Sequence, residues 1–389
     1  MRLVFYANCL GRGGAHQSML AWFDVLKSDP AVELVILCAE RGWFSDQLDQ
    51  RGLRYELLPM PRALGGIKHG QWKHRWRTAV QVLSMGAGLL RAWSRVVWLR
   101  ADGVVLTGGR DFIMLLPLAL RRRSNTVTIP QTTDWAEIPV CRTMCRVASR
   151  TYAISASVAQ SIEAMGIAST KISVQPLIYT VDHRGRLFEG QEARLHCGLP
   201  MDGPIIGMTG LIRPHKGQRE AILILREVLK QVPAARLVVV GTAGESDEAR
   251  RYEREIVELA AGPGLSGRVV FLGWRDDVPQ LMRAMNLMLV PSHDFEGVPR
   301  VILEGLEAGL PIVATDLPQF REVLGQFGAG ALFPIDQPGK WTDEIVALLR
   351  TPARLEAAAR HARAVWQANY SAEGAGPRIR QAFRDVALL

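Results

Sequence analysis

The order strand, loop, helix, strand between residues 287 and 315 constrains the fold of this chain more than any other feature. Residues 287–290 are continuously apolar and predict a buried strand. Pro299 predicts the start of a helix, because the missing proline N–H costs nothing at the first helical position. The helix is expected to end at Gly309, and residues 311–315 predict a second short apolar strand. Two buried strands joined by a helix indicate an α/β unit with a parallel sheet.

Two carboxylates stand eight positions apart in this stretch, Glu296 in the loop and Glu304 on the helix. A helix N-terminus that follows a strand is an anion-binding site. Because a carboxylate at its mouth would repel a phosphate, we expect Glu296 to meet hydroxyl groups instead. Glu304 can accept hydrogen bonds from a second hydroxyl pair, such as that of a ribose. A ligand with negative charge in the middle and hydroxyls at both ends fits this pattern, and a sugar nucleotide has it.

Residues 296–324, EGVPRVILEGLEAGLPIVATDLPQFREVL, resemble the two-glutamate region of retaining glycosyltransferases of the GT-B fold, family 4 (glycosyl transferases group 1). The resemblance implies an α/β protein of two Rossmann-like domains that face each other across a cleft. It implies that Glu296 holds the sugar hydroxyls and Glu304 the ribose. Gly297, Val298 and Pro299 would belong to the same donor-binding loop. The alternative is a solvated loop glutamate and a helix-surface glutamate in any Rossmann-like unit.

The resemblance also implies a division of the chain into domains. Residues 1–185 are expected to form an acceptor-binding domain, and residues 186–374 a domain that binds the nucleotide sugar. Residues 375–389 are expected to form a helix that crosses back to the first domain, as in similar enzymes. The polar segment 182–191 is typical of the linker between the two.

The segment GLIRPHKG at 210–217 predicts a cationic turn after a strand, suited to holding a diphosphate. Lys216 is in register with the lysine of the family, whereas Leu211 stands where the family has an arginine. Arg213 can substitute by reaching from two residues later. Lys216 and Arg213 would stabilise the leaving diphosphate, and with Glu296 they are the expected catalytic residues. The alternative is a pair of solvated cations on a surface turn.

The nucleotide base is expected near the ends of two further strands. By resemblance it lies close to Gly241 and to the residues after Gly273. Trp274 can stack on a base and Arg275 can contact it. Recognition of the base by the backbone is an equal alternative.

The first domain carries weaker signals for the acceptor side. Gly13 and Gly14 follow an apolar strand and open a helix, as in nucleotide-type α/β units. His16 stands where the family has a glutamate, either as a proton carrier or as a polar residue of the first helical turn. The histidine of the family's histidine–aspartate pair is missing at the next expected site, where Gln131 and Asp134 remain as expected acceptor contacts.

Charge is distributed unevenly along the chain. The net charge is +9, and residues 1–185 alone carry a balance of +10. The segment 62–100 contains eight basic residues, no acidic one and four interleaved tryptophans. Basic and aromatic faces on one helix predict contact with an anionic membrane surface. An ordinary covering helix with solvated arginines is the alternative.

Composition indicates a cytoplasmic protein, peripheral at the inner face of the cell membrane. The first residues run directly into a strand pattern, so no signal peptide is expected. No apolar run is long enough to predict a spanning helix. The five cysteines are scattered and imply neither a zinc site nor a disulfide framework. We expect no metal, no cofactor and no nucleic-acid partner.

The expected function is transfer of a hexose, with retained anomeric configuration, from a nucleoside diphosphate sugar to a lipid-linked or glycan acceptor. The expected setting is the assembly of bacterial surface polysaccharide or lipopolysaccharide. Two alternatives remain open: a GT-B sugar-nucleotide epimerase, and a non-catalytic nucleotide-sugar binding protein.

Overall fold

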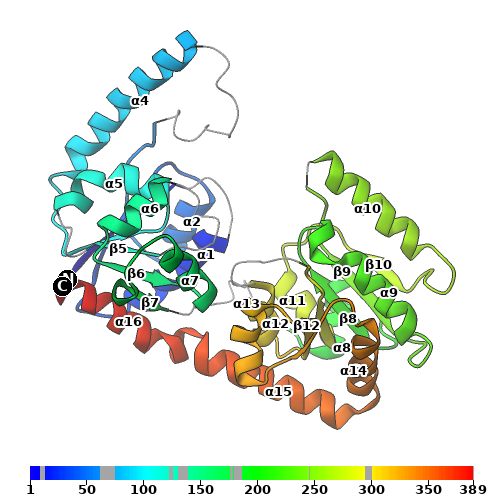
Figure 1. The fold of residues 1–389 in the computed structure, drawn as a ribbon. Coiled ribbons are helices and arrows are strands. Elements are labelled where there is room, and N and C mark those ends of the chain that lie inside the picture. Colours follow the sequence, from blue (N-terminus) through cyan, green and yellow to red (C-terminus); the bar gives the residue numbers. More distant parts are fainter. Residues whose placement is uncertain are drawn as a thin grey trace. The chain divides into compact units, whose positions relative to one another are not determined.

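The chain divides into two compact units (Figure 1). The first comprises Met1–Ile178 together with Ala372–Leu389, and the second comprises Tyr179–Ser371. The computed structural model describes residues 1–8, 14–61, 75–121, 126–129, 139–175, 178, 186–244, 246–293 and 300–388; within these, the side chains of 14–15, 75–85 and 386–388 are not described.

The first unit is built on a seven-stranded sheet in the order β3-β2-β1-β4-β5-β6-β7, and every neighbouring pair is parallel. The central strands are buried and apolar, since helices cover both faces of a parallel sheet. The direction in which strands are added reverses between β1 and β4. The strands are β1 (Arg2–Ala7), β2 (Glu33–Cys38), β3 (Tyr55–Leu57), β4 (Gly103–Leu106), β5 (Thr126–Thr128), β6 (Arg150–Ala153) and β7 (Ile172–Val174).

The last helix of the chain, α16 (Ala372–Leu388), packs in the first unit against α1. The ring of Phe383 lies 6.0 Å from that of Phe5 on the central strand. Arg384 forms an ion pair with Asp29, and the Tyr152 hydroxyl donates to the carbonyl of Ala382. The other helices of this unit are α1 (Gly14–Leu26), α2 (Trp43–Gln50), α4 (Arg75–Val96), α5 (Gly109–Arg121), α6 (Pro139–Val147), α7 (Ala156–Ala164) and the short η3 (Ser169–Lys171).

The second unit contains a six-stranded parallel sheet in the order β10-β9-β8-β11-β12-β13. Its order of strand addition reverses between β8 and β11. The strands are β8 (Ile205–Thr209), β9 (Arg236–Val240), β10 (Val269–Phe271), β11 (Leu287–Val290), β12 (Ile312–Thr315) and β13 (Ala331–Phe333). The helices are α8 (Gly190–Cys197), η4 (Pro214–Lys216), α9 (Gln218–Val228), α10 (Asp247–Ala260), α11 (Val278–Arg283), α12 (Arg300–Glu307), α13 (Pro318–Val323), η5 (Gly325–Phe327), α14 (Pro338–Arg350) and α15 (Pro352–Asn369).

Helix α12 follows the predicted strand–loop–helix–strand order. It is described from Arg300, and Pro299 lies outside the described residues. The helix closes where the sequence predicts, because the amide of Gly309 donates to the carbonyl of Leu306 and that of Leu310 to the carbonyl of Gly305. Strand β12 then runs parallel to β11. In the part of the chain that the structure describes, no helix has the length and apolarity needed to span a membrane.

Candidate active site

The order of strand addition in the second sheet reverses between the neighbouring strands β8 and β11, and we call this position the reversal point. Two loops lie there, one at the carboxyl end of each strand. In open α/β sheets, ligands bind outside the strand ends at such a point, because the chain leaves the two strands in opposite directions. The loop after β8 carries the cationic turn 210–217, and the loop after β11 begins at Pro291. Glu296, Gly297, Val298 and Pro299 of that second loop lie outside the described residues.

Gly217 allows the two loops to touch. It ends η4 and begins α9 with a left-handed φ of 75°. A Cβ placed on Gly217 would lie 2.0 Å from the carbonyl oxygen of Pro291, directly after β11. Any side chain at position 217 is therefore disfavoured for two reasons: the left-handed backbone conformation and the clash with the Pro291 carbonyl.

His293 links the same two loops. Its amide donates to the carbonyl oxygen of His215 over 2.8 Å. Its Nε2 lies 3.2 Å from a carboxylate oxygen of Glu220 in the first turn of α9. Lys216 follows His215 directly, so the loop that leads to Glu296 starts beside the lysine.

Backbone hydrogen bonds join the loops after β8, β9 and β10 in turn, at the carboxyl edge of the sheet. The amide of Gly210 donates to the carbonyl of Val240 over 2.9 Å, and that of Gly241 to the carbonyl of Gly273 over 2.8 Å. A Cβ on Gly241 would lie 1.9 Å from the carbonyl oxygen of Gly210, so the loops after β8 and β9 are in direct backbone contact. Arg213 extends toward the loop after β9, where a Cβ on Gly244 would be 3.4 Å from its Nη2.

The side chains of Trp274 and Arg275 differ in how much of each is available to a ligand. The Trp274 side chain is 66% exposed, and its Nε1 lies 3.4 Å from an Asp276 oxygen. Arg275 donates from Nε and Nη2 to the two carboxylate oxygens of Asp277, over 2.7 and 2.6 Å. The hydrogen bond from Arg275 lowers the pKa of Asp277. The indole is therefore open for stacking, whereas two of the guanidinium donors are already bound.

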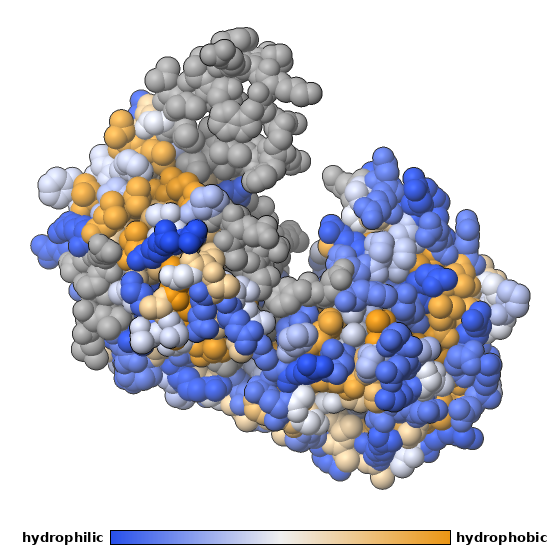
Figure 2. Space-filling model, in the orientation of Figure 1, coloured by the Kyte–Doolittle hydropathy of each residue, from blue (hydrophilic) through white to orange (hydrophobic). Residues whose placement is uncertain are grey.

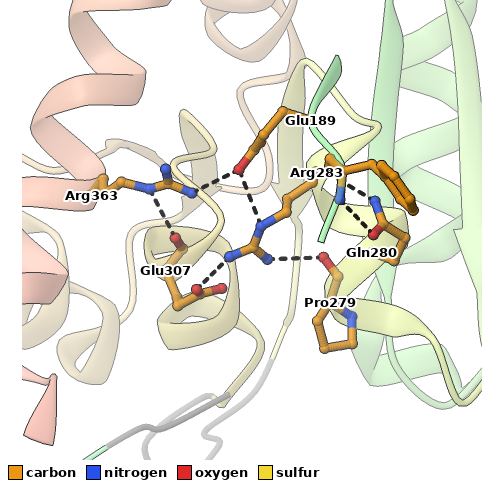
Figure 3. A network of polar contacts seen from close by, with 7 residues as sticks. Glu189, Pro279, Gln280, Arg283, Glu307 and Arg363 are labelled. Atoms are coloured by element: carbon orange, nitrogen blue, oxygen red, sulfur yellow. Dashed lines mark hydrogen bonds and ion pairs between the residues drawn. The ribbon is translucent and has the colours of Figure 1, made fainter. Parts of the chain in front are cut away.

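A polar network around the buried pair of Arg283 and Glu307 holds helix α12, which carries Glu304 (Figure 3). The Arg283 side chain, 4% exposed, donates to Glu307 and lies 3.3 Å from Glu189. Arg363 reaches both the Glu307 carbonyl and the Glu189 carboxylate. Glu304 itself is partly exposed, with Arg300 Nη2 at 3.5 Å. The network fixes the C-terminal end of α12 and so the direction of the helix that carries Glu304.

A pocket of about 520 Å³ adjoins the junction of the β8 and β11 loops. Its lining is mixed in charge, and the Tyr252 hydroxyl accepts from the amide of Arg219 at the start of α9. Sequence reasoning did not single out His215 or His293, although one stands inside the cationic turn and the other three residues before Glu296. The pocket is lined by Pro214, His215, Arg219, Glu220, Glu248, Tyr252 and His293.

On the first unit, His16 is the expected acceptor-side residue whose side chain is described. Its Nε2 lies 3.2 Å from Asn8 Oδ1, and its ring lies 5.4 Å from that of Phe44. Burial lowers the pKa of His16, which favours the neutral imidazole. Gly14 begins α1, and the other three expected acceptor contacts, Gly13, Gln131 and Asp134, lie outside the described residues.

Asp111 stands near the reversal point of the first sheet and was missed by sequence reasoning. It lies in the first turn of α5, just after β4, and is 2% exposed. The amide of Thr107 donates to Asp111 Oδ2 over 3.2 Å, and the Thr107 hydroxyl donates to the same oxygen. Burial raises the pKa of Asp111 to about 7. The sequence shows an aspartate directly before the apolar run 112–120, but its burial comes only from the folded unit.

Residues 203–351 match the model of the family described as glycosyl transferases group 1. The matched residues lie within the second unit, Tyr179–Ser371. The predicted resemblance is thereby confirmed for the stretch that contains the cationic turn, α12 and the strands around them.

Curated relatives match part of the chain. The "Lipopolysaccharide core biosynthesis mannosyltransferase LpsB" of Rhizobium meliloti is 29% identical over 188 residues, which are 48% of this chain and 53% of that protein. The chain therefore spans about half the length of this relative.

Solved structures match nearly the whole chain. Anabaena Alr3699/HepE in complex with UDP has a TM-score of 0.77 at 18% identity and covers 99% of both chains. A putative UDP-N-acetylglucosamine 2-epimerase from Listeria monocytogenes has a TM-score of 0.62 at 13% identity, covering 99% of this chain and 96% of its own. The predicted fold class, two Rossmann-like domains of the GT-B type, is confirmed. Structures described as a glycosyltransferase and as a putative epimerase share this fold, so the fold alone does not decide the activity.

Proposed function

We propose that this chain is a glycosyltransferase that moves a hexose from a nucleoside diphosphate sugar to a lipid-linked or glycan acceptor, with retention of the anomeric configuration. One observation carries the proposal: the contact of Gly217 and His215 with Pro291 and His293 at the reversal point of the second sheet. This contact brings Lys216 beside the start of the loop that contains Glu296. The name of LpsB, a mannosyltransferase, and the UDP bound by HepE support the same donor class.

The charges of the site suit a departing diphosphate. Lys216 and Arg213 would neutralise it as the bond from the anomeric carbon to the phosphate oxygen breaks. Glu296 would orient the sugar through its hydroxyls, and Glu304 would accept from the ribose. The acceptor oxygen bonds to the anomeric carbon on the face that the phosphate leaves, and its proton passes to a phosphate oxygen. This route requires neither a separate general base nor a metal.

The base would bind at the neighbouring strand ends. Gly241 keeps the loop after β9 close to the cationic turn. Trp274 offers an exposed ring for stacking. Arg275 would contribute the guanidinium donors that are not used in its two hydrogen bonds to Asp277. Gly297, Val298 and Pro299 would complete the donor loop.

The first unit would bind the acceptor. Gly13, Gly14, His16, Gln131 and Asp134 are the proposed contacts, and segment 62–100 would face an anionic membrane at the cytoplasmic side. In this proposal residues 1–185 serve the acceptor, 186–374 the donor, and 375–389 the return to the first domain. The setting would be assembly of surface polysaccharide or lipopolysaccharide.

Leu211 favours one alternative, a non-catalytic nucleotide-sugar binding protein. It stands at the position of the family's arginine, and its side chain is 40% exposed. An aliphatic side chain offers no donor to a diphosphate. Arg213, two residues on, would have to supply the missing charge for catalysis.

A donor screen followed by a turnover assay tests the proposal. UDP-, GDP- and dTDP-sugars are compared by thermal shift, because a ligand that binds the folded state raises its unfolding temperature. We expect one class to give a shift that Lys216→Ala abolishes, while Lys230→Ala, in an exposed pair with Glu227, retains it. Release of the nucleoside diphosphate with transfer to an acceptor excludes the binding protein, and release without an epimerised sugar nucleotide excludes the epimerase. A shift that persists undiminished in Lys216→Ala contradicts the diphosphate assignment.

A further inference from the structure

A pocket of about 450 Å³ lies in the first unit, between the segment that follows β3 and the C-terminal half of α4. Leu58, Met60 and Pro61 give it an apolar wall. Gly88 of α4 faces Pro61 closely, because a Cβ on Gly88 would lie 3.0 Å from Pro61 Cγ. A larger residue at position 88 would have to project into this wall or push it aside. The volume falls within the range of small-molecule sites.

Two arginines stand on the same side of α4 as Gly88. Arg91 and Arg95 line the pocket, and with Gly88 they follow a spacing of three and four residues that keeps them on one helix face. Both are exposed, and within the described residues neither side chain has an ion pair or a hydrogen bond. No acidic residue occurs between Leu57 and Ala101. An anion placed between the two guanidinium groups would relieve their mutual repulsion.

Exposed apolar side chains belong to the same part of the first unit. Leu57 is 40% exposed, Leu90 66% and Trp98 82%. Helix α5, which packs against α4, adds Leu120 at 55%. Figure 2 shows apolar residues gathered on the first unit around α5. Apolar surface beside unpaired arginines suits an amphiphile at a membrane better than a soluble anion.

We propose that this pocket binds a lipid phosphate. The phosphate lies between Arg91 and Arg95, and the first carbons of the hydrocarbon chain lie against Leu58, Met60 and Pro61. The inference rests on the proposed function for the source of the lipid, which is the membrane. The pocket itself is defined by its apolar wall and its two arginines. Arginine binds phosphate through paired hydrogen bonds, and burial of the methylene groups adds affinity that inorganic phosphate cannot gain.

Short-chain lipids test the chemistry of the pocket in solution. The full chain is titrated by calorimetry with dihexanoyl phosphatidic acid below its micellar concentration, with dihexanoyl phosphatidylcholine and with inorganic phosphate. We expect saturable binding of phosphatidic acid, at least about tenfold tighter than either other probe, since it alone offers both a phosphate monoester and acyl chains. Equal binding of inorganic phosphate or of phosphatidylcholine overturns the proposal, and so does no binding of phosphatidic acid.

Three variants separate the pocket from general surface charge. Arg91→Gln/Arg95→Gln removes the two charges, and Gly88→Leu fills the apolar wall while keeping them. Arg142→Gln/Arg146→Gln is the matched control, because this pair is also exposed and four residues apart on α6 of the same unit. We expect a loss of about tenfold in phosphatidic acid affinity for both pocket variants and wild-type affinity for the control.

These lipid-binding results can be told apart from a failure of the proposed nucleotide-sugar site. An equal loss in the control variant means that the charge of the unit as a whole binds lipid, and the proposal fails. Wild-type affinity in folded Gly88→Leu also contradicts the proposal. If that variant does not fold, Arg91→Gln/Arg95→Gln tests the proposal alone, because it changes only exposed residues. The thermal shift with nucleotide sugar is measured on the same proteins and is expected to be unchanged, because the donor residues lie in the other unit.

Discussion

The amide of His293 donates a hydrogen bond to the carbonyl oxygen of His215 over 2.8 Å. This bond joins the loop after β11 to the turn that contains Lys216. The carboxylate of Glu220 lies 3.2 Å from the His293 imidazole and holds the same loop from the start of α9. A third contact, between Gly217 and Pro291, closes the junction. Changes that open this junction are expected to weaken donor binding even when they remove no charged group.

Gly217→Ala tests the junction. The new Cβ would overlap the Pro291 carbonyl, and the left-handed backbone adds strain, so we expect a loss of about 2 kcal/mol or more in the free energy of unfolding. The donor-induced thermal shift should fall with it. Gly264→Ala is the control, since Gly264 has a similar φ of 76° with open space around it. It should cost about 1 kcal/mol and retain the donor shift; equal effects of the two variants in urea unfolding and in the shift would argue against the junction.

Removing the Arg283 charge should destabilise the second unit strongly. Arg283→Met leaves Glu307 buried without its partner, a loss of about 3–5 kcal/mol in similar buried pairs. The exposed pair Arg360–Glu356, at 3.8 Å, provides the comparison, and Arg360→Met should change stability by about 0.5 kcal/mol or less. Chemical denaturation of both variants gives the values. A small effect of Arg283→Met would show that solvent reaches the network after the substitution.

Stability should depend on pH through Asp111. Burial raises the pKa of Asp111 to about 7, while an unfolded aspartate titrates near about 4. The folded chain therefore binds a proton there that the unfolded chain has released, and this stabilisation, on the order of 4 kcal/mol, is lost as pH rises from about 4 to about 7.

Asp111→Asn should flatten this part of the profile. The amide cannot ionise, so thermal unfolding between pH 5 and 8 should become less dependent on pH and the variant should gain relative stability at pH 8. Asp46→Asn is the matched control, because Asp46 also stands in the first turn of a helix but is exposed. A wild-type slope in Asp111→Asn would mean that the carboxyl ionises normally.

The sequence predicted the fold class because its signals are local. Apolar strands, glycine turns and helix ends repeat along the chain, and the strand–helix–strand unit ending at β12 formed as its residues indicated. Contacts between distant loops carry no such local pattern. The pairing of His293 with Glu220 joins residues 73 positions apart, and the two acidic partners of Arg283, Glu189 and Glu307, come from two other segments. Asp111 was missed for the same reason, since only burial by the folded unit sets its pKa.

Trp274 should contribute to donor affinity without contributing to stability. Its side chain is 66% exposed at the end of the strand next to β9, so it packs little and its ring can stack on a base. Because stacking of a base on an aromatic ring is worth about 1–3 kcal/mol, Trp274→Ala should weaken nucleotide binding about tenfold and leave the unfolding temperature unchanged. Trp274→Phe should retain most of the affinity, and Trp98→Ala, which removes an exposed tryptophan from the first unit, should retain all of it. Calorimetric titration with the nucleoside diphosphate measures each value, and wild-type affinity in Trp274→Ala would assign base recognition to the backbone around Gly241 and Gly273.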